Sequence, residues 1–277
     1  MPKRYARDIR AGARSVAITG GGGGIGEALG RAFGRGGARV VLLDVAPDRL
    51  SEVAGRLCAE DIQVETRALD ITDPQACAAA FAPLEAGGMG DLDVLVNNAG
   101  ISHRSLFADT DPEVLRRVME VNFFGAVNCT RAALPSLRQR RGSVVALSSV
   151  AGFAPLVGRS AYAASKHALH GFFDTLRTEL SGDGVRVLLV CPAFVATDLD
   201  KRHLDASGHA RGDRRAAVGR PLQPVDVADA IVRAVADGDR ELLLSPVAHA
   251  SRWLKRLAPA AYDRLMLRGQ GGEFGLR

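Results

Sequence analysis

The sequence predicts a single α/β domain built on a doubly wound parallel sheet. Apolar runs rich in Val, Ile and Leu recur along the chain, and segments with helical spacing separate them. The runs are apolar throughout, which is typical of parallel strands that helices cover on both faces. Strand–helix alternation at this spacing builds βαβ units. A length of 277 residues, of which 47% are hydrophobic, suits one large core, and we see neither an internal repeat nor a second domain.

The elements follow one another in regular order. The first strand, at 14–19, ends in a string of glycines, and a helix at 25–36 follows it. In that helix Ile25, Leu29 and Phe33 share one face, and two glycines end it. Further strands are predicted at 39–44, 63–68, 94–97, 143–148, 185–191 and 241–245. Further helices are predicted at 48–60, 73 to about 84, 111 to about 137, and about 162 to 180.

Two segments fall outside this domain, which we place at 14–245, and one irregular stretch lies within it. Residues 1–13 are a basic leader without the apolar stretch of a signal peptide. Within the domain, the polar, Arg-rich stretch 198–222 lacks periodicity, which predicts a substrate lid or a disordered loop. Residues 246–277 form a helical extension with a kink predicted at Pro259. We expect it to pack on the protein's own body or on a partner subunit; the alternative is an anionic membrane surface.

Composition excludes several classes of function. The formal charge is +5, but Arg is spread along the whole chain and aromatic residues make up only 5%, which favours a solvated surface over a nucleic-acid site. The four cysteines are scattered, without metal-ligand spacing, so we expect no metal and a reducing cytoplasm. No run reaches the roughly 18 apolar residues of a membrane-spanning helix. These features predict a cytoplasmic protein without a nucleic-acid partner.

A glycine-rich segment from Thr19 to Gly26 lies between the first strand and the first helix. A pyrophosphate needs backbone N–H groups at close range and a helix N-terminus whose dipole favours negative charge, and glycines allow that approach. A flexible glycine turn is the alternative. Because a helix and a second strand ending in an acid follow the segment, it predicts a dinucleotide site.

Asp44 is that acid, 18 residues after Gly26. A carboxylate at this point accepts hydrogen bonds from the adenosine ribose and repels a 2′-phosphate. Val45 and Ala46 offer no cation for such a phosphate, and residue 23 is Gly where Arg could help. The sequence therefore favours NAD over NADP, although Asp44 could instead cap the following helix.

Tyr162 and Lys166 lie four residues apart at the start of a predicted helix, on one face. A phenol has an ordinary pKa of about 10, and a nearby ammonium lowers the pKa of such a group. The pair is therefore suited to proton transfer in an alcohol–carbonyl couple. Taken alone, this spacing is common on helix surfaces.

The context of this pair points to a family. The motifs are the glycine segment, Asn97-Asn98-Ala99-Gly100 after the fourth strand, Ser148-Ser149 after the fifth, and Tyr162 with Lys166. In their order and spacing the chain resembles the short-chain dehydrogenase/reductase family from about residue 14 to 245. The resemblance implies a Rossmann-like fold, a nicotinamide cofactor, a small-molecule alcohol or carbonyl substrate, and a homodimer or homotetramer.

The resemblance also implies roles for residues that would bind the cofactor. The pyrophosphate turn would comprise Thr19, Gly20, Gly24, Ile25 and Gly26. Asp70 and Ile71 would meet the adenine, and Asn98, Ala99 and Gly100 would lie along the cofactor. Pro192 and Thr197 match the segment that meets the carboxamide. In this segment Ala193 stands where the family usually has Gly, so the loop either carries strain at a positive φ or has a narrower pocket.

For catalysis, the resemblance implies Tyr162 as acid and base, with Ser149, 13 residues earlier, donating a hydrogen bond to the substrate oxygen. Ser148 is the neighbouring candidate for that donor. Lys166 would also hold the nicotinamide ribose, and Asn122 would relay protons with it through a water. We therefore expect NAD(H)-dependent interconversion of a secondary alcohol and a ketone. The apolar stretch 153–157 suggests a bulky apolar substrate.

Two other classes of function remain open. A catalytically silent relative would bind NAD and regulate a partner, although such a relative is expected to have lost one of the four catalytic residues. A membrane-docked scaffold would use the basic C-terminal tail.

Overall fold

The computed structural model describes residues 15–82, 88–197, 203–212 and 221–276. Its centre is a seven-stranded parallel sheet in the order β3-β2-β1-β4-β5-β6-β9. The strands are β1 (Ser15–Thr19), β2 (Arg39–Asp44), β3 (Val64–Ala68), β4 (Val94–Asn97), β5 (Ser143–Leu147), β6 (Arg186–Cys191) and β9 (Glu241–Leu243). The predicted fold class is thereby confirmed as a doubly wound, Rossmann-like sheet.

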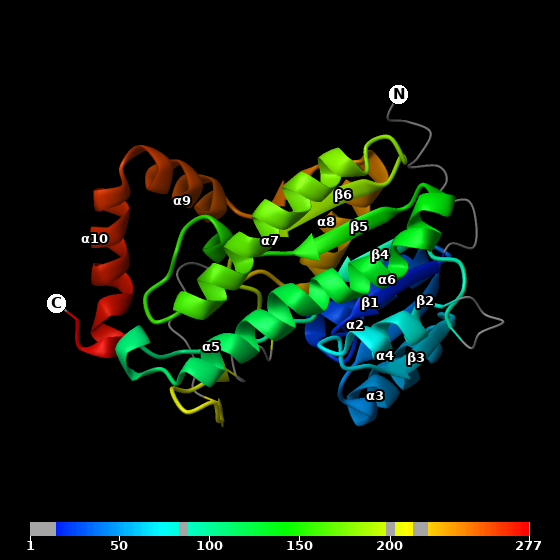
Figure 1. Cartoon of the computed structure of the whole chain (residues 1–277), viewed down its shortest axis with the longest axis horizontal. Helices are drawn as coiled ribbons and strands as arrows, with labels where there is room; N and C mark the ends of the chain where they lie inside the picture. Colours follow the sequence, from blue (N-terminus) through cyan, green and yellow to red (C-terminus); the bar gives the residue numbers. More distant parts are fainter. Residues whose placement is uncertain (1–14, 83–87, 198–202, 213–220, 277) are drawn as a thin grey trace.

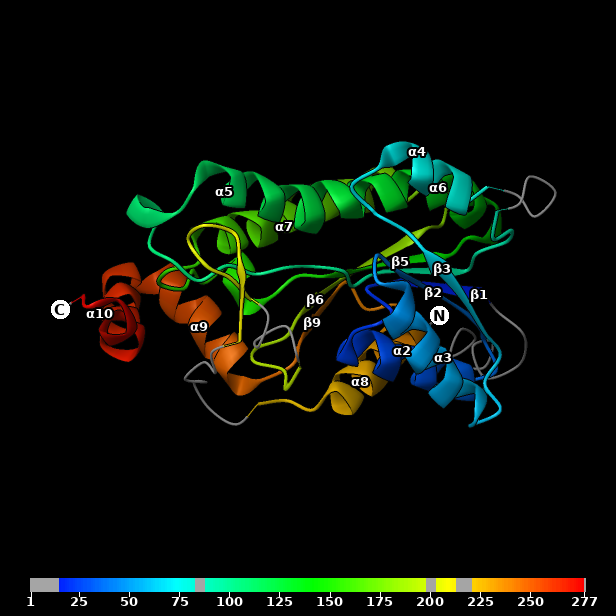
Figure 2. The same cartoon turned by 90° about the horizontal axis from the view of Figure 1, so that it is seen from below.

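Helices cover both faces of this sheet (Figures 1 and 2). One layer contains α2 (Gly24–Arg35), α3 (Pro47–Cys58) and α8 (Pro224–Asp237). The other contains α4 (Pro74–Ala80), α5 (Pro112–Met119), α6 (Gly125–Arg140) and α7 (Ser160–Glu179). Successive strand residues enter opposite cores: Ile18 packs with the first layer and Ala17 with the second. Burial on both faces is why the strands are apolar throughout.

The strand order reverses between β1 and β4, which are hydrogen-bonded neighbours. The loops that follow β1 and β4 lead to opposite faces of the sheet. Such a switch point leaves a crevice at the carboxyl ends of the strands. The glycine segment follows β1, and the Asn97–Gly100 motif begins at the end of β4. The topology thus brings the two motifs together.

Three features differ from the prediction. Helix α8 was not predicted at all. The long helix expected from residue 111 is divided by a π-helical turn, η3 (Glu120–Phe124), between α5 and α6. In the predicted lid, residues 203–212 carry a short hairpin of β7 (His203–Leu204) and β8 (Ala210–Arg211), and both β7 residues are buried. Residues 1–14, 198–202 and 213–220 lie outside the described residues, and so does the whole basic leader.

The C-terminal extension consists of α9 (Pro246–Leu257), α10 (Pro259–Gln270) and η6 (Gly271–Phe274). Pro259 separates two helices where we expected a kink. The extension packs on the chain's own body: the Tyr262 hydroxyl donates to the Pro155 carbonyl at 3.0 Å, and the Val157 N–H donates to Gln270 Oε1 at 3.2 Å. Among the described residues, no helix has both the length and the apolar character needed to cross a bilayer.

Candidate active site

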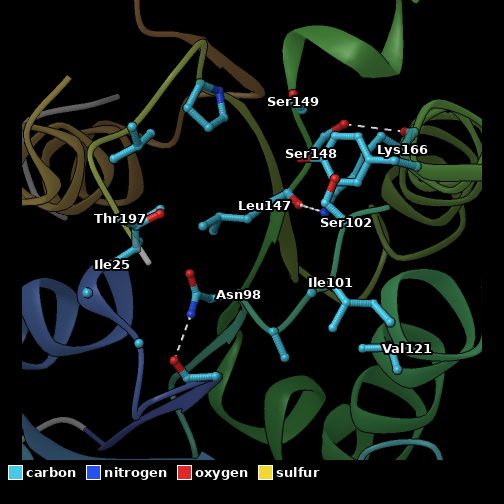
Figure 3. A pocket seen from close by; sticks show the side chains of 18 of the residues that line it. Ile25, Asn98, Ile101, Ser102, Val121, Leu147, Ser148, Ser149, Lys166 and Thr197 are labelled. Atoms are coloured by element: carbon cyan, nitrogen blue, oxygen red, sulfur yellow. Dashed lines mark hydrogen bonds between the residues drawn. The ribbon is translucent and has the colours of Figure 1, made fainter. Parts of the chain in front are cut away.

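A cavity of about 930 Å³ lies at the carboxyl ends of the strands. Its lining extends from the glycine segment to the C-terminal helices. Figure 3 shows Ile25 and Thr197 on one side of it and Ser148, Ser149 and Lys166 on the other, with Asn98 between. This volume is large enough for a dinucleotide together with part of a substrate.

The glycine segment forms a tight turn against the start of α2. Gly20 has a φ of +67°, and a Cβ on Gly26 would lie 2.3 Å from the Gly20 carbonyl oxygen. Gly20, Gly24 and Ile25 line the cavity. Thr19 and Gly26 lie behind the lining instead. The Thr19 hydroxyl accepts the N–H groups of Asn98 at 3.0 Å and Ala99 at 3.1 Å, and so ties the turn to the loop after β4.

Asp44 lies at the edge of the cavity, where both of its carboxylate oxygens accept backbone N–H groups. Oδ2 accepts from Gly22 at 3.0 Å and Oδ1 from Ala46 at 3.1 Å. Arg49, on α3, also lines the cavity. A Cβ on Gly22 would contact both side chains, at 2.9 Å from Arg49 Cβ and 3.2 Å from Asp44 Oδ2. Sequence reasoning considered only the two residues after Asp44 and missed this cation, which lies five residues after it.

The other predicted cofactor residues, apart from Thr19 and Gly26, all line the cavity: Asp70, Ile71, Asn98, Ala99, Gly100, Pro192 and Thr197. Asp70 is held by Thr72, whose N–H and hydroxyl donate to Oδ1 at 2.9 and 2.7 Å. A Cβ on Gly24 would lie 3.6 Å from Thr197 Cγ2, so the loop after β6 approaches the glycine turn.

Ala193 also lines the cavity and has no positive φ; among the described non-glycine residues only Asp61 and Arg141 do. Ala in place of Gly at position 193 therefore causes no backbone strain from a positive φ. The other expectation, that its methyl group narrows the pocket, stays a prediction.

Tyr162, Lys166 and Ser149 all line the cavity. The Lys166 side chain is 4% exposed, and its ammonium donates to the Leu147 carbonyl at 2.7 Å. It lies 5.6 Å from the centre of the Tyr162 ring. Burial lowers the pKa of Lys166 to about 8. Helix α7 places the two side chains together because they are one turn apart.

The two serines after β5 have different partners. Ser148 is buried, and its hydroxyl donates to the Lys166 carbonyl at 3.3 Å, so its proton is used within the fold. The Ser149 hydroxyl accepts the Ala151 N–H at 3.2 Å, which leaves its own proton for another acceptor. This difference supports Ser149 as the donor to a substrate oxygen.

Asn122 lies in the π-helical turn and does not line the cavity. Its Oδ1 accepts the Ile101 N–H at 2.8 Å, and its Nδ2 donates to the Ile101 carbonyl at 2.9 Å and to Ser165 Oγ at 3.0 Å. It fixes the loop that carries Gly100, and a Cβ on Gly100 would lie 3.2 Å from Asn122 Oδ1 and 3.7 Å from Lys166 Nζ. Asn122 is thus a positioning residue here, and its role in a proton relay stays a prediction.

The end of the cavity next to the C-terminal helices was largely missed by sequence reasoning. Of the apolar stretch 153–157, only Leu156 lines it. The Phe153 ring instead packs against His170 and Arg252, and Ala154 is buried. The lining residues that the sequence did not indicate include Ser102, Arg117, Phe194, Val247, Tyr262, Met266 and Gln270. Several of them lie more than 100 positions from the catalytic loop after β5, so no local pattern could connect them.

Beside this cavity, His170, Cys191 and Glu241 bring their polar atoms within 4.8 Å of one another, a grouping that could hold a metal ion. The Cys191 thiol lies 3.5 Å from His170 Nε2, and burial raises the pKa of Cys191 to about 12. Glu241 already forms an ion pair with Arg252. The residues are too far apart in sequence for ligand spacing to reveal them.

The sequence is similar to those of known proteins. The family model described as short chain dehydrogenase matches residues 14–207. Dehydrogenase/reductase SDR family member 7B of Bos taurus is 40% identical over 261 residues, which cover 91% of this chain and 79% of that protein. Dehydrogenase/reductase SDR family protein 7-like of Anopheles gambiae is 37% identical over 272 residues, covering 95% of this chain and 84% of that protein.

The fold is also similar to those of solved structures. A short chain dehydrogenase/reductase from Burkholderia phymatum in complex with NAD has a TM-score of 0.80 and 26% identity, covering 91% of this chain and 96% of that one. A short chain dehydrogenase from Burkholderia cenocepacia in complex with NADP has a TM-score of 0.76 and 26% identity, covering 92% of this chain and 98% of that one.

Proposed function

We propose that this chain, which belongs to the short-chain dehydrogenase/reductase family, interconverts a secondary alcohol and a ketone with NAD(H). The observation that carries the proposal is that Tyr162, Lys166 and Ser149 line one cavity, with the Lys166 ammonium 5.6 Å from the centre of the Tyr162 ring. An acid–base group, a buried cation and a hydroxyl donor are the three groups that a carbonyl oxygen needs as it gains or loses a proton.

The residues present fit a nicotinamide dinucleotide. The turn at Gly20 and Gly24 would hold the pyrophosphate at the start of α2, since both glycines line the cavity there. Asp44 would hold the adenosine ribose, and Thr197 would contact the nicotinamide. When bound, the cofactor supplies a hydride donor or acceptor.

The chain's own residues would handle the proton. In reduction the Tyr162 hydroxyl donates its proton to the carbonyl oxygen, and in oxidation its phenolate removes the alcohol proton. Ser149 donates a hydrogen bond to the same oxygen, and this bond strengthens as negative charge develops there. Below pH 8 Lys166 is protonated, and its ammonium beside the Tyr162 ring favours the phenolate.

The Tyr162→Phe substitution tests this assignment. Removal of the proton donor is expected to lower kcat by about 10²- to 10⁴-fold on a panel of secondary alcohols and ketones. Tyr262→Phe is the matched control, because it makes the same change in the same cavity, away from Lys166. Equal turnover by Tyr162→Phe and wild type would refute the mechanism. Thermal stabilisation of the wild type by NAD without turnover of any substrate would instead favour a regulatory NAD-binding relative.

The preference for NAD rests on Asp44, whose carboxylate would repel a 2′-phosphate. Arg49 acts in the opposite sense, because its guanidinium could pair with such a phosphate. We expect Asp44→Ala to lower the ratio of kcat/KM for NAD over NADP by on the order of tenfold, equivalent to about 1.4 kcal/mol. Arg49→Gln, measured beside it, should raise the same ratio. A wild type that prefers NADP would overturn the preference.

The outer part of the cavity supports an apolar substrate. Leu156, Val247 and Met266 line it there, together with the ring of Tyr262. We infer that KM falls as the apolar part of the ketone becomes larger, since each buried CH₂ group contributes about 0.8 kcal/mol to binding. A series of 2-ketones of increasing chain length, assayed with NADH, measures this directly.

A further inference from the structure

The outer face of the C-terminal helices carries large apolar side chains in contact with solvent. Trp253 is 59% exposed and Leu257 75% exposed on α9, and Leu265 is 52% exposed on α10. Trp253 and Leu257 lie one helical turn apart. Figures 1 and 2 show both helices at one end of the molecule, beyond the sheet and its two layers. A cluster of exposed apolar side chains on a soluble body marks a contact surface.

Three exposed arginines lie on the same two helices as these apolar side chains. Arg256, Arg264 and Arg268 have no carboxylate partner among the described residues. The acidic side chains of the extension are already paired, Asp263 with Lys255 and Glu273 with Arg104. The outer face therefore combines apolar side chains with an uncompensated charge of three cations.

The inner face of the same helices is fixed to the body. Ala248 and Tyr262 are buried, and Gln270 bonds the loop after β5. Val247, Tyr262 and Met266 line the cavity. The two helices thus form a wall with the cavity on one side and the outer face on the other.

We propose that this outer face docks the protein on an anionic lipid surface. Trp253, Leu257 and Leu265 would enter the boundary between headgroups and acyl chains, and the three arginines would contact the anionic headgroups. Trp is well suited to this boundary, since its ring is apolar and its N–H is polar.

Charge argues against a second copy of the chain as the occupant. In a two-fold dimer the same patch faces itself, so Arg256, Arg264 and Arg268 would face the same three cations. The cores of protein interfaces are depleted in charged residues, and like charges brought together there are costly. An anionic membrane supplies the compensating charge and the apolar environment together.

The chain contains a single tryptophan, so its fluorescence reports this surface directly. Full-length protein would be titrated with vesicles of phosphatidylcholine alone and with vesicles of equal parts phosphatidylcholine and phosphatidylglycerol. We expect a blue shift of the emission with the anionic vesicles only. Phosphatidylcholine with brominated acyl chains, mixed with phosphatidylglycerol, should quench it. Binding should weaken in 0.5 M KCl, because salt screens exposed charges.

Two sets of substitutions separate the contributions of charge and apolar area. Gln at Arg256, Arg264 and Arg268 is expected to weaken vesicle binding about 100-fold, at about 1 kcal/mol for each cation near the surface. The Leu257→Ser, Leu265→Ser pair should weaken binding by about tenfold or more. Retained circular dichroism spectra and melting temperatures would show that these exposed changes leave the fold intact.

Matched controls make the same changes elsewhere on the surface. Gln at Arg131, Arg233 and Arg240 removes three positive charges from exposed positions outside the extension, and none of the three has a carboxylate partner among the described residues. The Phe107→Ser, Val225→Ser pair removes two exposed apolar side chains outside it. The affinity of both controls for anionic vesicles is expected to stay within about twofold of the wild-type affinity. This difference is much smaller than a tenfold change, which corresponds to about 1.4 kcal/mol.

Three outcomes would overturn the proposal. The first is unchanged Trp253 emission with anionic vesicles. The second is a blue shift that grows with protein concentration without vesicles, because it would show a second copy covering the face. The third is vesicle binding that the outer-face substitutions leave intact, because it would place the contact elsewhere on the chain.

Discussion

At the scale of single residues, Lys166 shows a conflict between stability and function. Its ammonium is buried, so the folded state holds the proton less tightly than the unfolded chain does, and its pKa falls from 10.5 to about 8. Below pH 8 the folded state therefore carries a penalty of roughly 3 kcal/mol, which is relieved as the pH rises from 8 to 10.5. The hydrogen bond to the Leu147 carbonyl offsets part of it. This cost is consistent with the proposed role of Lys166 in proton transfer.

We therefore expect Lys166→Met to raise the free energy of unfolding at pH 7 while it abolishes turnover. The gain should be about 1–2 kcal/mol, because the lost hydrogen bond leaves the Leu147 carbonyl without its donor at a cost of about 1–2 kcal/mol. Urea unfolding at pH 7 and pH 10 measures it, and the gain should shrink at pH 10. A variant that is less stable than wild type at pH 7 would contradict this account of Lys166.

The sequence predicted which residues belong to the site better than it predicted which of them line the cavity. The motifs named the residues of the glycine turn and the catalytic helix, and most of them line the cavity. Thr19, Gly26 and Asn122 do not. The side chains of Thr19 and Asn122 form hydrogen bonds within the protein, and Gly26 leaves room for the backbone of Gly20, which a Cβ would contact. A motif records which residue is required, and only packing shows whether it meets a ligand or supports another residue that does.

At the scale of elements, the turn between β1 and α2 depends on close backbone contact. A Cβ on Gly26 would lie 2.3 Å from the Gly20 carbonyl oxygen and 2.8 Å from Gly21 Cα, which are backbone atoms that cannot move independently of the strand. On Gly24 the nearest atom would be a methyl carbon of Thr197 at 3.6 Å, an ordinary contact.

These two glycines give a paired prediction. Gly26→Ala should lower the free energy of unfolding by about 2 kcal/mol or more, since overpacking costs about 1–3 kcal/mol. Gly24→Ala should leave the stability of the cofactor-free protein nearly unchanged and reduce its thermal stabilisation by NAD, because the methyl group enters the cavity. Melting curves with and without NAD measure both effects. Equal stability of the two cofactor-free variants would show that the turn tolerates a side chain at Gly26.

Helix α8 shows what the sequence contained and the prediction missed. Val227, Ile231 and Val235 recur at helical spacing, Pro224 stands in the first turn and Gly238 follows the helix with a φ of +74°. These are start and stop signals of a helix. The π-helical turn η3 is different, because its sequence continues the helical pattern of its neighbours and only the contacts of Asn122 distinguish it.

At the scale of the whole molecule, the ends of the described chain form opposite parts of one cavity. The glycine turn after β1 lies at one end of its lining, and α9 and α10 supply the outer wall. The doubly wound sheet could be predicted from strand–helix alternation, but this closure could not, because the extension meets the loop after β5 only through contacts such as Tyr262 with Pro155.

That contact predicts the behaviour of the outer wall. Tyr262→Phe leaves the Pro155 carbonyl without its donor, so we expect a loss of about 1 kcal/mol in stability and faster hydrogen exchange in α10. KM for bulky ketones should rise, with kcat little changed, because the wall binds substrate and does not transfer protons. Unchanged exchange in α10 would show that this bond does not hold the extension in place.

The wall formed by α9 and α10 has a consequence for how this enzyme could be diversified. The proposed reacting groups lie on α7 and on the loop after β5, whereas the surface that would contact the far end of a substrate belongs to the last 30 residues or so of the chain. Exchanging that terminal pair of helices for another would alter which molecules fit while the proton-transfer apparatus stayed intact. Substrate selectivity could therefore be changed separately from the proton-transfer residues.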